Sequence, residues 1–440
     1  MKKIWIGIDD TDSTNGGCTT YTALLIIKRL NEENIDLIGF PRLVRLNPNI
    51  PWKTRGNGAI SFKIGAGKGL KTKIGEFQDK DIFCFEKNKN ENLHTTQISN
   101  IIQKIIDENA KLDDKKTNTG YVINSKQFHY SIYEKTVREV VTIKETKEFL
   151  KKNDAYYKGY KNSRGLIGAT ASISWKPKQN KTFELITYRE PQRWGTKREV
   201  DDETTKQMNE KYPTTFDNFD FENNHNRIVP SSPCPVLYGI RGTNYDELIH
   251  AKTTIKSENV HGWIIFESNQ GTDEHLVEKT IKDIKKYESV IVQGSINTQP
   301  HTIKGGHVFF KITDGKNEID CAAYEPTKQF RNIIRKLIPG DEIQAYGGVR
   351  NKPLTINLEK IKINKLEEKK IKIENPLCPN CGKHMKSKGK DQGFKCIKCG
   401  IKNNEPKTQL EKREIKKGYY EVAVCARRHL STPIKLMNQP

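Results

Sequence analysis

Two pairs of cysteines toward the end of the sequence constrain the fold more than any other feature. They are Cys378-Pro379-Asn380-Cys381 and Cys396-Ile397-Lys398-Cys399, separated by fourteen residues. Two CxxC turns at this spacing match the tetrahedral four-thiolate sites of zinc ribbons. We predict a structural Zn²⁺ site, because four thiolates leave no open coordination position. Its ligands are Cys378, Cys381, Cys396 and Cys399.

An acidic turn near the start is the second informative feature. The stretch IWIGIDDTDSTNGGCTTY, residues 4–21, opens with an apolar run that favours a buried strand. The carboxylates of Asp9, Asp10 and Asp12 follow, and then a glycine-containing loop and an apolar segment of helical length. Carboxylates bind Mg²⁺, and a helix start attracts phosphate. Turn capping explains one or two of these acids but not three, so the pattern favours a magnesium-bound phosphate.

The charge of the chain suggests a polyanionic partner. The 76 lysines and arginines exceed the 54 aspartates and glutamates by 22. A lysine-rich composition without any partner, or an acidic membrane surface, would also account for this surplus. However, no apolar stretch is long enough to span a bilayer. The start lacks a signal-like region because acids interrupt it. We expect a cytoplasmic protein that keeps its nine cysteines reduced.

Several loops combine glycine with arginine. The turn Arg55-Gly56-Asn57-Gly58 is typical of a hairpin, but its arginine also makes a phosphate contact possible. The loops at 162–170 and 189–198 fit ligand or RNA contact, and equally fit ordinary surface loops. In the same part of the chain we also expect a solvated loop at 113–120 and strands at 169–175 and 183–188.

Residues 289–363 are dominated by short strands. The expected strands are 290–295, 307–313, 318–324, 342–348 and 354–363, with a helix near 327–337. A helix between the third and fourth of five strands is the order of an oligonucleotide-binding (OB) barrel, although another small barrel fits as well. The ribbon and the tail that follow carry cations that either lie on phosphates or are solvated.

Taken together, these motifs resemble those of the archaeal tRNA-isoleucine 2-agmatinylcytidine synthetases. The matching stretches run nearly end to end and are GIDDTDS, GGCTTY, GFPRLVRLNP, KTRGNGA, RGLIGA, YREPQRWGTKR, PVLYGIRG, AAYEPTKQFR, the double CxxC and ARRHLS. The resemblance implies a multidomain α+β protein. Its parts are a kinase-like α/β domain that binds ATP (1–132), a ferredoxin-like α+β domain (133–287), an OB-fold β-barrel (288–366) and a zinc ribbon with a basic tail (367–440).

The resemblance also implies a ligase-type enzyme that modifies the wobble cytidine of the isoleucine tRNA with a CAU anticodon. ATP phosphorylates the C2 carbonyl oxygen of that base, and the primary amine of agmatine then displaces the phosphate. The modified tRNA reads AUA instead of AUG. The implied ligands and partners are therefore ATP, Mg²⁺, Zn²⁺, agmatine and this tRNA.

Residue roles follow from the matched positions. Asp9, Asp10 and Asp12 are implied to act on the triphosphate, with Asp9 and Asp12 on Mg²⁺, and Thr19 matches the family's phosphorylatable threonine. The nucleotide-binding candidates are Arg55, Gly56, Asn57 and Gly58. The candidates for the agmatine pocket are Arg164, Gly168 and Arg198. The RNA-binding candidates are Lys383, Lys386, Arg427 and Arg428.

Rival functions stay open at the level of sequence. A nucleic-acid-binding protein without catalysis explains the barrel, the ribbon and the charge, but not the acidic turn. A small-molecule kinase predicts ATP consumption that needs no tRNA. An ATP-dependent RNA-binding protein that uses a different amine, or acts differently, is a third alternative.

Overall fold

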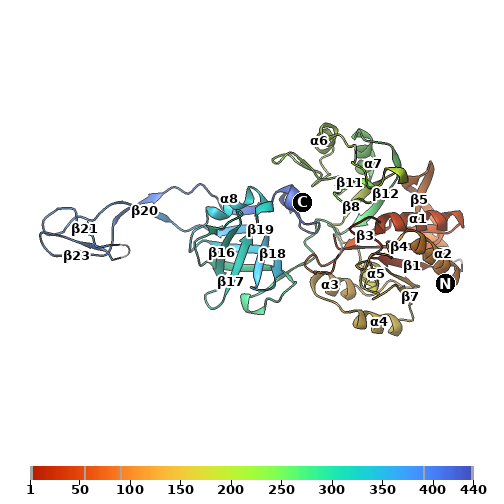
Figure 1. Cartoon of the computed structure of the whole chain (residues 1–440), viewed down its shortest axis with the longest axis horizontal. Helices are drawn as coiled ribbons and strands as arrows, with labels where there is room; N and C mark the ends of the chain where they lie inside the picture. Colours follow the sequence, from red (N-terminus) through yellow and green to blue (C-terminus); the bar gives the residue numbers. More distant parts are fainter. Residues whose placement is uncertain (1–2, 54–55, 90–91, 390–391, 438–440) are drawn as a thin grey trace.

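The computed structural model describes residues 3–53, 56–89, 92–389 and 392–437. Figure 1 shows an elongated molecule with a large sheet and its helices at one end, a barrel in the middle, and a small ribbon held on a thin stalk at the other end. None of the helices in these ranges is long and apolar enough to cross a membrane.

The large sheet contains ten strands of the described chain. They are β1 (Ile4–Asp9), β2 (Asp36–Ile38), β3 (Arg42–Arg45), β4 (Gly58–Phe77), β5 (Lys80–Lys89), β6 (Gly120–Asn124), β7 (Tyr156–Gly159), β8 (Thr182–Arg189), β11 (Val236–Gly242) and β12 (Val260–Ser268). Their order is β11-β8-β12-β3-β4-β1-β6-β7, with β2 and β5 beside β4. Strand β1, which carries the acidic turn at its end, therefore lies inside the sheet between β4 and β6.

Helices cover both faces of this sheet. They are α1 (Thr19–Glu32), α2 (Thr95–Asn109), α3 (Ser131–Arg138), α4 (Ile143–Lys152), α5 (Gly165–Ser174), α6 (Asp202–Lys211) and α7 (Tyr245–Thr254). Alternate residues of β1 face opposite sides: Ile4 and Ile6 pack in one core with α1 and α2, while Trp5 packs in another with α5. Helices α6 and α7 cover β8 and β11 in a third core.

Helix α5 corrects a prediction, because residues 169–175 were expected to form a strand and the strand assignment is wrong. The hydroxyls of this segment bond within the helix, with Thr170 Oγ1 donating to the Leu166 carbonyl at 2.6 Å. Small residues also let α5 approach β1 closely. A Cβ added to Gly7 would lie 2.1 Å from the Ala169 carbonyl oxygen.

The barrel matches its sequence prediction. Its strands are β14 (Ser289–Ile296), β16 (Val308–Thr313), β17 (Glu318–Ala323), β18 (Glu342–Arg350) and β19 (Thr355–Lys365). Helix α8 (Phe330–Arg335) lies between the third and fourth of these. The strands pair in the order β14-β18-β19-β17-β16, and β16 returns to β14, so the sheet closes around its own core.

Shorter strands complete the molecule. They are β9 (Phe219–Asp220), β10 (His225–Asn226), β13 (Leu276–Glu278), β15 (His301–Thr302), β20 (Lys369–Glu374), β21 (Lys386–Ser387), β22 (Phe394–Lys395), β23 (Lys402–Asn403), β24 (Lys407–Glu411) and β25 (Gly418–Glu421). Strands β20 and β24 pair to form the stalk, and β21–β23 form the ribbon. The chain then returns along β19 as β25 and ends its described part in the short helix α9 (Ile434–Met437).

Candidate active site

The acidic turn is held in place by a segment distant in sequence. Asp10 adopts a positive φ of 60°. Its side-chain Oδ2 accepts a hydrogen bond from the backbone N–H of Asn118 at 2.9 Å. Thr117 Oγ1 donates to the Asp12 carbonyl, and Thr119 Oγ1 to the Asp10 carbonyl, each at 2.7 Å. Residues 117–119 are buried. Gly120 is also buried and begins β6, so the prediction that 113–120 is a solvated loop is wrong for residues 117–120.

Asp9 is the most confined of the three carboxylates. Burial raises its pKa well above the usual value, and the nearby charges of Asp10 and Asp12 add to this effect. Its carboxylate also meets α5, since a Cβ added to Gly168 would lie 2.0 Å from Asp9 Oδ2. A bound cation would offset the repulsion within the turn, and oxygen ligands of this kind suit Mg²⁺. The chemistry of these donors therefore suits Mg²⁺, although among the described residues only the four ribbon cysteines already bring their ligand atoms together around one point.

A cavity of about 340 Å³ joins the predicted site segments. Asp9, Asp10 and Asp12 line it together with Gly56, Asn57 and Gly58 of the glycine turn and with Arg164 and Gly168 at the start of α5. Arg55, the arginine of the glycine turn, lies outside the described residues. Three segments that are far apart in the chain thus meet around one space.

Thr19 stands next to the acidic turn, at the first position of α1. The hydroxyl of Thr11, a residue within the turn, donates to Thr19 Oγ1 at 3.2 Å and lies 3.2 Å from Thr22 Oγ1. Only 8% of Thr19 is exposed. The Thr19 hydroxyl therefore belongs to a threonine network joined to the acidic turn through Thr11, but Thr19 is not among the described residues that line the cavity.

Models of known families match most of the chain. They are the TiaS TCKD domain over residues 5–162, the TiaS FLD domain over 163–275, an OB-fold nucleic acid binding domain over 290–364 and the TiaS C-terminal zinc ribbon domain over 375–415. The OB-fold model covers the closed barrel, and the ribbon model covers the two cysteine pairs.

Full-length relatives agree with these matches. The tRNA-isoleucine 2-agmatinylcytidine synthetase TiaS of Archaeoglobus fulgidus is 42% identical over 442 residues, which cover 99% of this chain and 98% of the relative. The TiaS of Methanocaldococcus jannaschii is 42% identical over 448 residues and is covered completely, as is this chain. The chain belongs to the TiaS family.

Solved TiaS structures have the same fold. A complex of TiaS with its isoleucine tRNA and ATP superposes with a TM-score of 0.84 at 40% identity, covering 100% of this chain and 98% of that one. A complex of TiaS with the same tRNA, AMPCPP and agmatine gives a TM-score of 0.83 at 38% identity, with the same coverage.

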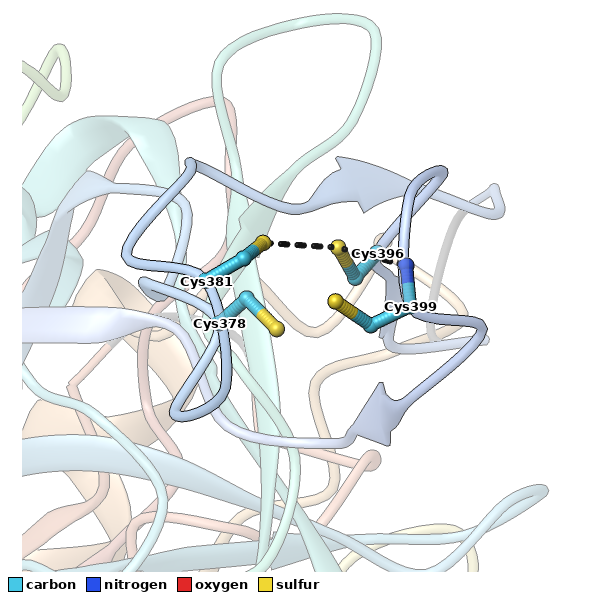
Figure 2. A group of neighbouring side chains, drawn as sticks. All are labelled: Cys378, Cys381, Cys396 and Cys399. Carbon is cyan, nitrogen blue, oxygen red and sulfur yellow. Dashed lines mark hydrogen bonds between the residues drawn. The ribbon is translucent and has the colours of Figure 1, made fainter.

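The ribbon of this TiaS-family chain brings its four cysteines together. Their sulfur atoms lie within 4.8 Å of one another, and Figure 2 shows the side chains pointing inward from two facing loops. Cys381 Sγ and Cys396 Sγ are 3.6 Å apart. Gly382 and Gly400 have φ values of +65° and +71°, which explains why glycine follows each pair. This arrangement fits one tetrahedral Zn²⁺.

Other predicted site residues lie elsewhere in the TiaS-family fold. Arg198 is not among the described residues that line the cavity. Its guanidinium instead donates to the carbonyls of residues 230, 232, 234 and 236 at 2.7–2.9 Å. Arg427 forms ion pairs with Asp217 and Glu421. Substrate contact by Arg198 and RNA contact by Arg427 stay predictions.

The remaining RNA-binding candidates differ in exposure. Arg428 is half-buried and pairs with Glu359 at 3.3 Å. Lys383 and Lys386 are exposed on the ribbon, and the ribbon lies at the opposite end of the molecule from the large sheet (Figure 1). RNA contact by these three residues also stays a prediction.

Sequence reasoning missed several residues of the cavity wall in this TiaS-family chain. Trp52 is 51% exposed, and the Arg164 guanidinium lies 4.7 Å from the centre of its ring. Lys53 also lines the cavity, and burial together with Arg428 lowers its pKa to about 8. An aromatic residue beside the glycine turn was a usable signal for Trp52. Residues 139–143, which also line the cavity, show no sequence feature that predicts this position.

Proposed function

We propose that this protein conjugates agmatine to C2 of the wobble cytidine of the CAU-anticodon isoleucine tRNA, using ATP. The observation that carries the proposal is the cavity in which the acidic turn, the glycine turn and the start of α5 meet. It occurs in a chain that is similar over its whole length to 2-agmatinylcytidine synthetases. Structures of such relatives with tRNA, ATP and agmatine support each proposed substrate.

The acidic turn serves the first step in this proposal. Asp9 and Asp12 would hold Mg²⁺, and Asp10 orients the turn through the backbone amide of Asn118. A bound Mg²⁺ would supply neutralisation of charge on the triphosphate, which is the main demand of phosphoryl transfer. The glycine turn at 56–58 brings backbone close to the nucleotide. Thr19 adjoins the transferred phosphoryl group, and ATP supplies that group to the C2 carbonyl oxygen of the cytidine.

The second step joins agmatine to the activated base. The primary amine of agmatine forms a bond to C2, and the phosphate leaves with the former carbonyl oxygen. The base must be unstacked to reach the cavity. Arg164 and Gly168 shape the wall on that side. The guanidinium of agmatine requires carboxylate or carbonyl acceptors.

The domain plan belongs to the same proposal. A kinase-like part (1–132) would bind ATP, and a ferredoxin-like part (133–287) would complete the cavity. The barrel (288–366) and the ribbon with its tail (367–440) would hold the tRNA by phosphate and shape. Because tRNA is the substrate, we place the reaction in the cytoplasm.

Incorporation of radiolabelled agmatine into a CAU-anticodon transcript tests the reaction. We expect label that requires ATP and Mg²⁺, and none in a matched transcript with uridine at the wobble position. Asp12→Asn should abolish incorporation while tRNA binding persists. ATP turnover that needs no tRNA would instead indicate a small-molecule kinase. Tight tRNA binding without any label would indicate a binding protein or a different amine.

A further inference from the structure

A buried group of arginines surrounds one carboxylate close to the glycine turn. Arg241 on β11 stands directly across from Glu184 on β8, with Arg241 Nε 3.7 Å from Glu184 Oε1. Arg45, at the end of β3, places Nη2 3.2 Å from Glu184 Oε2. The side chains of Arg45 and Arg241 are 14% and 12% exposed. One carboxylate therefore already serves two guanidinium groups.

Arg227 adds a third guanidinium. Asn218 ties its backbone to that of Arg241: the Asn218 carbonyl accepts from Arg227 N at 3.0 Å, and Asn218 Oδ1 accepts from Arg241 N at 2.9 Å. Burial, and next the charge of Arg241, lower the pKa of Arg227. We call Arg45, Arg227 and Arg241 the arginine cluster.

His429 closes the arginine cluster from the tail of the chain. Its Nδ1 lies 2.9 Å from Gln270 Oε1. The charge of Arg45, followed by burial and by Arg241 and Arg227, holds the pKa of His429 well below its usual value. The ring is therefore neutral and leaves the positive charge of the cluster to the arginines.

The hydrogen-bond donors of the cluster are not all used by protein groups. The Nε atoms of Arg45, Arg227 and Arg241 are buried and have no hydrogen-bond partner among the residues that the structure describes. The nearby acid Asp217 is already paired with Arg427. Among the described residues, Glu184 is the only carboxylate that forms an ion pair with the cluster, and the charges of Asp217 and Asp220 act on Arg227 from farther away. Like charges removed from water repel one another strongly, so the site calls for an anion.

The cluster directly adjoins the proposed reaction site. A Cβ added to Gly56 would lie 3.3 Å from both Arg45 Nη1 and His429 Nε2, and Gly56 lines the cavity. An anion held by the cluster would therefore sit beside the glycine turn. A cytidine pulled out of its stack carries backbone phosphates on both sides, and guanidinium groups bind phosphate through paired hydrogen bonds.

We propose that the arginine cluster binds a backbone phosphate of the tRNA next to the cytidine that enters the cavity. This inference rests on the proposed function. Free phosphate or pyrophosphate could bind the same guanidinium groups, and the experiment distinguishes these ligands from RNA.

The test begins with Arg227→Gln, because the guanidinium of Arg227 has no ion pair within the described residues and its loss strands no carboxylate. Binding of the CAU transcript is measured over a range of salt. We expect affinity to fall about tenfold, and the slope of log affinity against log salt to fall by about one. Arg29→Gln removes the same charge from an exposed side chain paired with Glu32 and Glu33. This control should change neither quantity.

A neutral methylphosphonate at each linkage flanking the wobble cytidine locates the contact without relying on one variant. Wild-type protein should lose about tenfold affinity at one linkage, and Arg227→Gln should lose none there. Equal losses in both proteins, or unchanged binding by a folded Arg227→Gln protein, would overturn the proposal. Binding of pyrophosphate that needs Arg227, without coupling to any linkage, would overturn the RNA assignment. Agmatine incorporation by the wild type is measured separately. If the phosphate contact is confirmed but no agmatine is incorporated, the proposed reaction fails and the proposed phosphate site stands.

Discussion

The backbone of Gly168 and the carboxylate of Asp9 occupy adjoining space, so a single methyl group should disturb the site. An added Cβ would lie 2.0 Å from Asp9 Oδ2, which forces either α5 or Asp9 to move. Overpacking of this kind costs about 1–3 kcal/mol, and misplacing a reacting group by about 1 Å lowers rates by about 100-fold. We expect Gly168→Ala to incorporate agmatine about 100-fold more slowly while tRNA affinity is kept. A normal rate in the folded variant would contradict the contact.

Glu359 should make the stability of the fold depend on pH. Burial alone would raise its pKa, but His275, Arg428 and Lys360 outweigh it and lower the pKa from 4.5 to about 2. A carboxylate whose pKa is lowered on folding stabilises the protein above the unfolded pKa. This contribution, about 3 kcal/mol at pH 7, is lost as the pH falls from about 4.5 through about 2.

Melting temperatures of wild type and Glu359→Gln check this prediction. The variant should melt lower at pH 7, and the difference should narrow by pH 3. A difference in melting temperature that stays constant between pH 7 and pH 3 would show that the ion pairs of Glu359 are not its cause.

Single residues also show where sequence reasoning about the site stops. Asp9, Asp10, Asp12 and Gly56 belong to short motifs whose chemistry is local, and they meet at the cavity as neighbouring features. Asn118 falls within the segment predicted to be a solvated loop, yet its backbone N–H donates to Asp10 Oδ2. That role depends on the pairing of β1 with β6, which begins at Gly120. The pairing of two strands so far apart in the chain cannot be predicted from the sequence alone.

At the scale of elements, the barrel was predictable and α5 was not. Strand β16 alternates buried and partly buried residues from Val308 to Thr313, so its period of two is visible locally. Helix α5 is buried at nearly every position and therefore has no polar face to reveal a helical period. Its small residues serve close contact with β1, which is a tertiary property.

The ribbon is an element that should depend on metal. We expect Cys396→Ser to lose most of the single equivalent of bound zinc, because only three thiolates remain and structural zinc contributes directly to folding. The salt dependence of tRNA binding should also fall, by about one unit of slope for each phosphate that the ribbon no longer binds. Zinc analysis and filter binding measure the two effects.

Cys425→Ser is the matched control for the ribbon, because Cys425 lies outside the cysteine group. It should keep both the zinc and the tRNA affinity. Full zinc occupancy in Cys396→Ser would contradict the four-thiolate site.

At the scale of the whole molecule, Arg427 should govern how the barrel is joined to the sheet. Only 5% of its side chain is exposed, and it pairs with Asp217 of the central segment and Glu421 of the strand that adjoins the barrel. Removing one partner of a buried pair costs about 3–5 kcal/mol. We expect Arg427→Met to unfold at lower denaturant concentration and to become more extended in small-angle X-ray scattering.

The double variant Asp217→Asn/Arg427→Met separates the lost charge pair from lost packing. It should regain part of the stability, since one of the two carboxylates left without Arg427 is gone. A double variant no more stable than Arg427→Met would assign the loss to packing instead.

The tail that carries Arg427 and His429 also sets an order of assembly during synthesis. Arg428 reaches Asn49 near the start of the chain and Glu359 in the barrel, and the His429 carbonyl accepts from Gly271 N at 2.8 Å. Domains fold as the ribosome delivers them, and residues 427–429 are translated after every part that they join. A nascent chain paused within the ribbon would hold a formed cavity without His429 on its arginine cluster. An unfinished copy of the protein would therefore lack part of the surface on which we propose that the tRNA backbone binds.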